Sequence, residues 1–401
     1  MNALGRLLMS RFWTTLALLA ALGEWTLWCW WRGETPSWAV HLAALGALFA
    51  LNRAACEAFE VEAHEATHRH AVGRTLLAAG FTAAIGAGTL AVTAGAWVAV
   101  QVLGAFPAEA GAFGGRAAAW FGSGFDLLAG VTVSAAMSVA LHGYVHGHRR
   151  LVVTQLEVPV AGLAAGLDGL RIVHVSDLHV GPLAHAPSLL AALDDATALA
   201  PDLVCVTGDL VDSRFADLER WMPHLARLRA RYGVFAILGN HDGDAGRERV
   251  AAAVARHSGW RLLRDEVVAL DLPGGRLHVA GLEDRPLRVA RQALPELLAR
   301  LPAEAPAVLM VHHPALFDLA AGAAPLVLAG HTHGGQVAVP GLPRLNPARF
   351  TMTRFDAGTF ERNGSILHVS RGLGVSGQRL RIAVPREITV VTLRAAAALA
   401  A

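Results

Sequence analysis

Charged residues are scarce in this chain of 401 residues: Asp, Glu, Lys and Arg together make up 16%, against about 25% in ordinary soluble proteins. Hydrophobic residues make up 54%. The net charge is only +2, and no basic stripe of the kind that tracks a nucleic-acid backbone is visible. We therefore expect part of the chain to lie in lipid, and we expect no nucleic-acid partner.

Cysteine is also scarce, and no internal repeat of useful period is visible. Cys29, Cys56 and Cys205 are far apart in the sequence, and none belongs to a CxxC pair. This pattern argues against a disulfide framework or a zinc ribbon and fits a reducing compartment.

The first 150 residues contain four apolar stretches, where roughly 20 residues are needed to span a bilayer. Most of the tryptophans lie in this region, and their half-polar rings suit a membrane interface. Glu24 and His41 fall inside two of the stretches and should face the interior of a helical bundle. The stretches are Phe12–Trp31, the shorter Trp38–Leu51, Thr75–Phe106 and Leu127–Val145.

The basic residues that flank these stretches predict the topology. If four helices cross, most flanking arginines share one side, which should be the cytoplasm. A cleavable signal peptide is not favoured, because tryptophans rather than small residues follow the first stretch. We expect a multi-pass protein of the inner membrane with cytoplasmic termini and a cytoplasmic catalytic domain. The arginines on the predicted cytoplasmic side are Arg6, Arg11, Arg53, Arg69, Arg74, Arg149 and Arg150, with Arg32 and Arg116 opposite.

From about Leu151 the pattern changes to short β-branched runs, separated by turns and by helical segments, which indicates an α/β domain over residues 151–401. The predicted strands are Leu170–Val175, Leu203–Thr207, Gly233–Leu238, Leu277–Ala280, Ala307–Val311, Leu326–Ala329, Ile366–Val369 and Ile388–Leu393. The predicted helices are Ser188–Leu199, Arg214–Arg231, Arg247–His257 and Gln292–Leu301.

Five of the apolar runs end in residues that can bind a metal ion. A single Asp or His at a strand end is usually a turn former, but five such ends together indicate an active-site edge. Oxygen and imidazole ligands without thiolate suit manganese, iron or zinc. The runs are followed by Asp177 and His179, by Asp209 and Asp212, by Asn240, His241 and Asp242, by His312 and His313, and by His331 and His333.

These blocks, read in order as DxH, GD, GNHD, an isolated His and GHxH, resemble the calcineurin-like metallophosphoesterase family. The resemblance covers roughly Arg171 to Leu393. The segments Ser370–Gly374 and Pro385–Thr389 are similar to the closing segment of its membrane-associated bacterial branch. The resemblance implies a four-layer α/β/β/α sandwich, here preceded by an all-α transmembrane region, residues 1–150.

The resemblance also implies seven metal ligands. They are Asp177, His179 and His333 for a first ion, Asp209 as a bridge, and Asn240, His312 and His331 for a second ion. His313 would be a neighbour rather than a ligand.

Three further residues receive roles. His241 would lie near the leaving group as a general acid or as a stabiliser of phosphoryl charge. Asp212 would orient the ring of His241 or serve only as a turn residue. Arg371 would contact a substrate phosphate or form a structural ion pair. Gly243 replaces an aromatic residue that is frequent in the family, which leaves the substrate's shape open.

The implied function is hydrolysis of a phosphate mono- or diester, with two divalent ions that activate a bridging water for in-line attack. Substrates could be lipid-derived or other phosphorylated small molecules, and anchoring favours lipid-derived ones. The alternatives are a non-catalytic sensor of a phosphorylated ligand and, from the HExxH pattern at His64–His68, a membrane metalloprotease. The GxGxxG pattern at Gly372–Gly377 should be a loop rather than a dinucleotide site.

Overall fold

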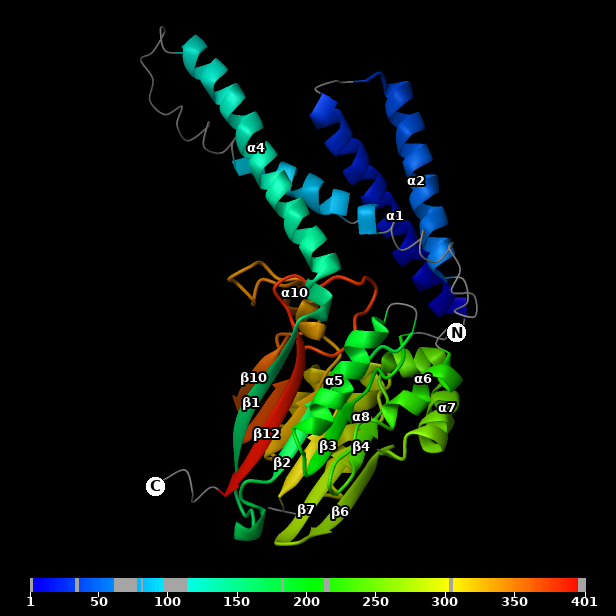
Figure 1. Cartoon of the computed structure of the whole chain (residues 1–401), viewed down its shortest axis with the longest axis vertical. Coiled ribbons are helices and arrows are strands. Elements are labelled where there is room, and N and C mark those ends of the chain that lie inside the picture. The colour runs from blue at the N-terminus through cyan, green and yellow to red at the C-terminus, as the bar shows by residue number, and fades with distance from the viewer. Residues whose placement is uncertain are drawn as a thin grey trace. The chain divides into compact units, whose positions relative to one another are not determined.

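The computed structural model describes residues 3–32, 36–60, 78–80, 82–96, 114–181, 184–212, 217–302 and 306–395. The chain divides into two compact units, Met1–Tyr144 and Val145–Ala401. Figure 1 labels the helices and strands. The HExxH segment lies outside the described residues.

The N-terminal unit is helical. Its helices are α1 (Ala3–Arg32), α2 (Trp38–Glu60), the apolar helix Ala78–Ala96 and α4 (Gly114–Val145), which ends at the unit boundary. Two helices among the described residues are long and apolar enough to cross a membrane, Ala78–Ala96 and Gly124–Arg149, and the apolar part of α2 is shorter. That four helices cross the membrane therefore stays a prediction.

Polar side chains inside this unit bond to one another between α1 and α2. The amide of Asn52 donates to the carboxylate of Glu24 over 2.9 Å, and Trp25 Nε1 donates to His41 Nδ1 over 2.7 Å. Asn52 is buried. Such pairing reduces the cost of placing polar groups in an apolar bundle, as predicted for Glu24 and His41.

The C-terminal unit contains two mixed sheets of six strands each. The first has the order β1-β12-β2-β3-β4-β5 and the second β10-β11-β9-β8-β7-β6. The strands of the first sheet are β1 (Leu151–Val160), β2 (Arg171–Val175), β3 (Leu203–Thr207), β4 (Val234–Ile237), β5 (Arg261–Leu262) and β12 (Arg386–Ala395). Those of the second are β6 (Glu266–Leu272), β7 (Gly275–Gly281), β8 (Ala307–Met310), β9 (Leu326–Ala329), β10 (Gly358–Arg362) and β11 (Ser365–Val369).

The two sheets pack face to face, with helices on their outer faces. Alternate residues of a strand point to opposite faces, so β2 places Ile172 in the core between the sheets and Val173 in the core under the helices. The first sheet is covered by α5 (Ala186–Ala198), α6 (Leu218–Leu225) and α7 (Asn240–His257), and the second by α8 (Leu287–Leu298) and α9 (Phe317–Ala320). The predicted four-layer sandwich is confirmed.

Several element boundaries were predicted wrongly. The helix expected at Arg214–Arg231 is the shorter α6, which contains Pro223 and ends at Leu225. Helix α7 (Asn240–His257) has a kink at Gly246, whose φ and ψ of 99° and 94° are not helical, so the predicted helix Arg247–His257 is present as the part after the kink. The helical turn before the kink, which begins with the GNHD motif, was not predicted. Strands β1, β5, β6 and β10 were not predicted; β1 pairs with β12, which lies more than 200 residues later.

Candidate metal centre

The predicted ligands lie together at one edge of the two sheets. Strands β2, β3 and β4 run parallel in the first sheet, and β8 and β9 run parallel in the second. The carboxyl ends of parallel strands meet at the same edge, so residues that directly follow them become neighbours. The first sheet thereby supplies Asp177, His179, Asp209 and Asn240, and the second supplies His312, His331 and His333.

The first donor group consists of Asp177, His179 and His333. The Nε2 atoms of the two imidazoles are 2.9 Å apart, and Asp177 Oδ1 lies 3.4 Å from His333 Nε2 and 4.0 Å from His179 Nε2. All three side chains are buried. Two imidazole nitrogens and a carboxylate oxygen at this separation form the donor set of a cation site.

The second group consists of Asp209, Asn240, His312 and His331. The oxygen Asn240 Oδ1 lies 3.0 Å from His312 Nε2 and 2.8 Å from His331 Nδ1. Asp209 Oδ2 lies 3.3 Å from His312 Nε2 and also 3.5 Å from His179 Nε2 of the first group. One carboxylate oxygen therefore lies between both groups, where the resemblance implies a bridge.

Several predicted ligands have an unusual backbone conformation. Asp177, His179, Asp209, His331 and His333 have φ values of 52°, 44°, 50°, 72° and 51°. Such left-handed conformations are uncommon for residues other than glycine and persist where surrounding contacts hold them, often at functional sites.

Two glycines allow the strand ends to approach. A Cβ atom at Gly330 would lie 1.9 Å from Ser176 Oγ, and one at Gly239 would lie 2.2 Å from Asp209 Oδ1. Any other residue at these positions would push apart the loops that carry Asp177 and Asp209.

Burial controls the protonation of the imidazoles. It lowers the pKa of His179 to about 3 and holds the pKa values of His331 and His333 well below the usual range, so these rings are neutral and can bind a cation. Burial also acts to lower the pKa of His312, but the carboxylate of Asp209 raises it well above the usual value. His312 Nδ1 lies 2.7 Å from the carbonyl oxygen of Thr207, to which it can donate, so Nε2 is the ligand atom.

His241 lies beside both donor groups. Its ring is 4.8 Å from the ring of His179, and its backbone amide donates to Asp209 Oδ1 over 2.9 Å. Burial opposes protonation, but the carboxylates of Asp209 and Asp212 raise the pKa of His241 above its ordinary value. A protonated imidazole at this position can donate a proton.

The expected contact between Asp212 and His241 is present in a different form. His241 Nδ1 lies 2.6 Å from the backbone carbonyl oxygen of Asp212, so the main chain rather than the carboxylate orients the ring. The carboxylate Oδ1 lies 3.7 Å from His179 Nδ1. The side chain of Asp212 therefore lies nearer to a predicted ligand than to the predicted acid.

The guanidinium of Arg371 is occupied by a buried carboxylate. Its Nη2 lies 2.7 Å and its Nε 3.1 Å from the oxygens of Glu387, and the backbone amide of Arg371 also donates to Glu387. This contact is the structural ion pair that was one of the two roles expected for Arg371. The other role, contact with a substrate phosphate, stays a prediction. His313 lies beside the site, and the centre of its ring is 4.3 Å from that of the His331 ring, with the two planes tilted by 31°.

Two residues hold the loops of the site together, a role that the sequence did not assign to Asp242 and that Arg381 has without any local pattern. Asp242 is buried and accepts backbone hydrogen bonds from Gly239, Leu210 and Val211 over 2.8, 3.1 and 3.0 Å, so it joins the two loops that carry Asn240 and Asp209. Arg381 is buried and donates to carbonyl oxygens of the loop that follows β11. The fourth position of GNHD marked Asp242 in the sequence, whereas no local pattern marks Arg381.

The residues present fit a pair of divalent cations. In each donor group, the nitrogen and oxygen atoms of several side chains lie within about hydrogen-bond distance of one another. Neither group contains a cysteine. Carboxylate, amide and imidazole donors suit manganese, iron or zinc.

A family model described as calcineurin-like phosphoesterase matches residues 170–335. An uncharacterized metallophosphoesterase of Aquifex aeolicus is 30% identical over 231 residues, 56% of this chain and 85% of that protein. The uncharacterized metallophosphoesterase YkuE of Bacillus subtilis is 28% identical over 275 residues, 67% of this chain and 94% of that protein. A transmembrane protein with metallophosphoesterase domain of Danio rerio is 29% identical over 270 residues, 64% of this chain but only 61% of that longer relative.

Proposed function

The chain belongs to the calcineurin-like phosphoesterase family, and from this premise we propose that it is a membrane-anchored hydrolase that uses two divalent ions to cleave a phosphate mono- or diester. The observation that carries the proposal is the position of Asp209 Oδ2 between the two donor groups. A single carboxylate oxygen within reach of both groups suits a pair of ions that act on one phosphorus.

The proposed ligands are those that the resemblance implies: Asp177, His179 and His333 for one ion, Asn240, His312 and His331 for the other, and Asp209 for both. When bound, the ions would neutralise the charge of the phosphate ester and lower the pKa of a water molecule.

The protein's own residues would supply orientation and a proton. The carbonyl of Asp212 fixes the His241 ring through Nδ1, so Nε2 is available to donate to the oxygen of a leaving group. Burial opposes protonation of His241, but the carboxylates of Asp209 and Asp212 raise its pKa above the ordinary value, and this direction favours the protonated form that a general acid needs. Neutral His331 and His333 and the buried carboxylates keep the arrangement rigid before substrate binds.

Membrane anchoring is supported by the apolar helices Ala78–Ala96 and Gly124–Arg149 and by the printed name of the Danio rerio relative. We propose a multi-pass inner-membrane protein whose catalytic unit faces the cytoplasm. A substrate that resides in or near the bilayer, such as a lipid-derived phosphate ester, would be the most accessible one.

The second candidate is a sensor that binds a phosphorylated ligand without turnover. His241 distinguishes the two, since a pure binding site needs no proton donor beside the cations. The test is metal analysis of the purified full-length protein together with turnover of a phosphate monoester and a phosphodiester. Turnover that depends on stoichiometric divalent metal supports the hydrolase. Metal binding with tight retention of the intact ester, and no cleavage of either class, would establish the sensor instead.

A further inference from the structure

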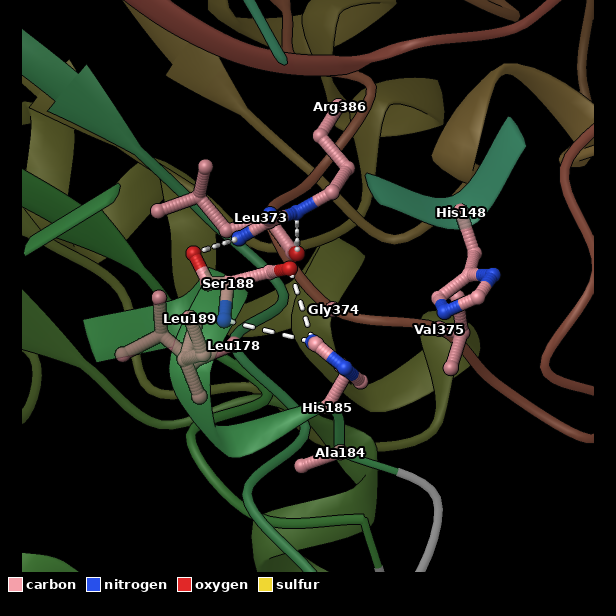
Figure 2. Close-up of a pocket in the computed structure, with 10 residues that line it drawn as sticks. All are labelled: His148, Leu178, Ala184, His185, Ser188, Leu189, Leu373, Gly374, Val375 and Arg386. Atoms are coloured by element: carbon pink, nitrogen blue, oxygen red, sulfur yellow. Dashed lines mark hydrogen bonds between the residues drawn. The ribbon is translucent and has the colours of Figure 1, made fainter. Parts of the chain in front are cut away.

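A pocket separate from the metal centre lies within the C-terminal unit (Figure 2). It encloses about 270 Å³ of empty volume, counted to its open mouth. Figure 2 shows the side chains of His148, His185 and Arg386 around it, with the apolar side chains of Leu189 and Val375 completing the wall. Because this volume includes open solvent, the enclosed part of the pocket is small and suits a small group.

Arg386 is a buried guanidinium at the wall of this pocket. Only 3% of its surface is exposed. Its Nε donates to the carbonyl oxygen of Leu373 over 2.5 Å and its Nη2 to that of Ser188 over 3.1 Å. Among the described residues, the ion pairs include no carboxylate partner for Arg386. Burial lowers the pKa of Arg386 to about 10, and the more distant charge of Asp195 opposes this shift only in part. A buried charge is costly unless it is closely paired, so a bound anion would stabilise this cation.

The histidine side chains in the pocket wall can also donate hydrogen bonds. The backbone amide of Ser188 donates to His185 Nδ1 over 3.3 Å, so in the neutral ring Nε2 carries the hydrogen and is a donor. Burial, Arg149, Arg379 and Arg386 together lower the pKa of His185. The ring of His148 lies 5.6 Å from that of His185. No acidic residue lines the pocket, and the local charge therefore favours an anion.

We propose that this pocket binds a phosphate group, held by Arg386 and His185, as an anion site distinct from the metal centre. The apolar wall of Leu189 and Val375 would exclude water and strengthen the electrostatic attraction. The phosphate belongs either to a lipid headgroup or to a free phosphate compound.

The chain's connectivity puts a lipid headgroup within reach. His148 lies in the 3₁₀ turn η1 (Gly147–Arg149), three residues after α4 ends at Val145, and the candidate membrane span Gly124–Arg149 includes that turn. Three residues extend at most about 11 Å. If α4 crosses the bilayer, His148 of the pocket wall therefore lies within this distance along the chain of the end of that helix.

The pocket shares a wall with the metal-binding loop. Leu178, between two predicted ligands, lines the pocket. Gly374, also in the wall, donates from its amide to the carbonyl oxygen of Asp177 over 2.6 Å, and Leu373 donates to that of Ser176 over 2.9 Å. A bound phosphate would therefore brace the segment that carries Asp177 and His179.

The test uses full-length protein in detergent, with metal removed by a chelator so that phosphate cannot bind at the metal centre. Inorganic phosphate is titrated calorimetrically at physiological ionic strength. We expect saturable binding that is at least tenfold weaker in Ala184→Phe, which fills the pocket, and in Arg386→Met. Arg394→Met, on the same strand β12 but paired with Glu157 in an exposed ion pair, should bind like the wild type.

Ala184→Phe keeps every hydrogen bond of Arg386, so it decides the outcome if Arg386→Met does not fold. A second arm compares the thermal stability of the metal-free protein in micelles that contain phosphatidic acid or diacylglycerol. Stabilisation by phosphatidic acid that Ala184→Phe abolishes assigns the phosphate to a lipid, and equal stabilisation by inorganic phosphate assigns it to a soluble compound. Wild-type protein that responds to neither phosphate source, or an Ala184→Phe variant that responds to both as the wild type does, overturns the proposal.

Discussion

The two sheets of the C-terminal unit supply different chemistry to the same edge. The first sheet supplies both carboxylates, Asp177 and Asp209, together with the proposed acid His241. The second sheet supplies imidazoles, namely His312, His331 and His333. The negative charge that would hold the proposed ions thus comes from one sheet, and imidazoles from the other would complete each site. Metal binding should consequently hold the two sheets together.

The largest expected effect comes from the carboxylate shared by both groups. Asp209→Asn keeps the side-chain shape but removes the charge, so both ions should bind weakly and turnover should fall on the order of 10³-fold or more, because each ion contributes several kcal/mol of transition-state stabilisation. Metal content and kcat/KM are measured together. Asp194→Asn, at an exposed ion pair on α5, is the control. A metal-loaded Asp209→Asn enzyme with ordinary turnover would contradict the bridging role.

His241→Ala tests the first sheet's proton donor without removing a predicted ligand. We expect turnover to fall about 10²- to 10⁴-fold, the usual contribution of general acid–base catalysis, while metal content is unchanged. The loss should shrink for an ester with a good leaving group, which needs little protonation. An equal loss for good and poor leaving groups would mean that His241 acts only by positioning.

Adjacent histidines of the second sheet provide a matched pair. His312→Ala removes a donor 3.3 Å from Asp209, so one ion should bind at least about tenfold more weakly, a loss of about 1.4 kcal/mol or more. His313→Ala changes the next residue, whose ring contacts that of His331 without being a predicted ligand, and should retain both ions. Titration of metal-free protein with manganese checks both variants. Equal losses in the two would show that the ligand has been assigned to the wrong histidine.

Asp242 tests how the first sheet's loops are held. Asp242→Ala would leave three backbone N–H groups without their acceptor, and each buried unsatisfied donor costs about 1–3 kcal/mol. We expect the free energy of unfolding to drop by about 3 kcal/mol, allowing for partial access of water. Asp244→Ala, at an exposed position of the same helix, should change it little. Denaturant unfolding of metal-free protein separates this effect from metal binding.

The smallest expected effect is on the chemical labelling of Cys205, which is buried at the interface between the two sheets. Burial raises the pKa of its thiol to about 12, so only about 10⁻⁴ of it is thiolate at pH 8. In a Cys29→Ser/Cys56→Ser variant, maleimide should label native protein far more slowly than unfolded protein. The raised pKa means that labelling should accelerate as pH rises. Rapid labelling at pH 8 would show that the sheets separate readily.

Much of the metal centre could be predicted from the sequence, because its ligands directly follow buried strands. Parallel strands bring their carboxyl ends to one edge whatever the exact register, so Asp177, Asp209 and His331 needed only a strand pattern and a following polar residue. Edge strands were harder. The strand β1 has a half-exposed, alternating pattern, and its partner β12 is distant in sequence, so local patterning could not establish the pair.

The sequence by itself determined the apolar N-terminal region and the α/β character of the following domain, since strand periodicity and residue chemistry are local properties. The family resemblance then implied the four layers and the candidate ligands. Only the tertiary structure decided that Asp212 orients His241 through its carbonyl, that Glu387 occupies Arg371, and that Arg386 lines a pocket beside His185. These contacts join segments far apart in the chain. They depend on how strands pair and loops pack, which residue spacing does not specify.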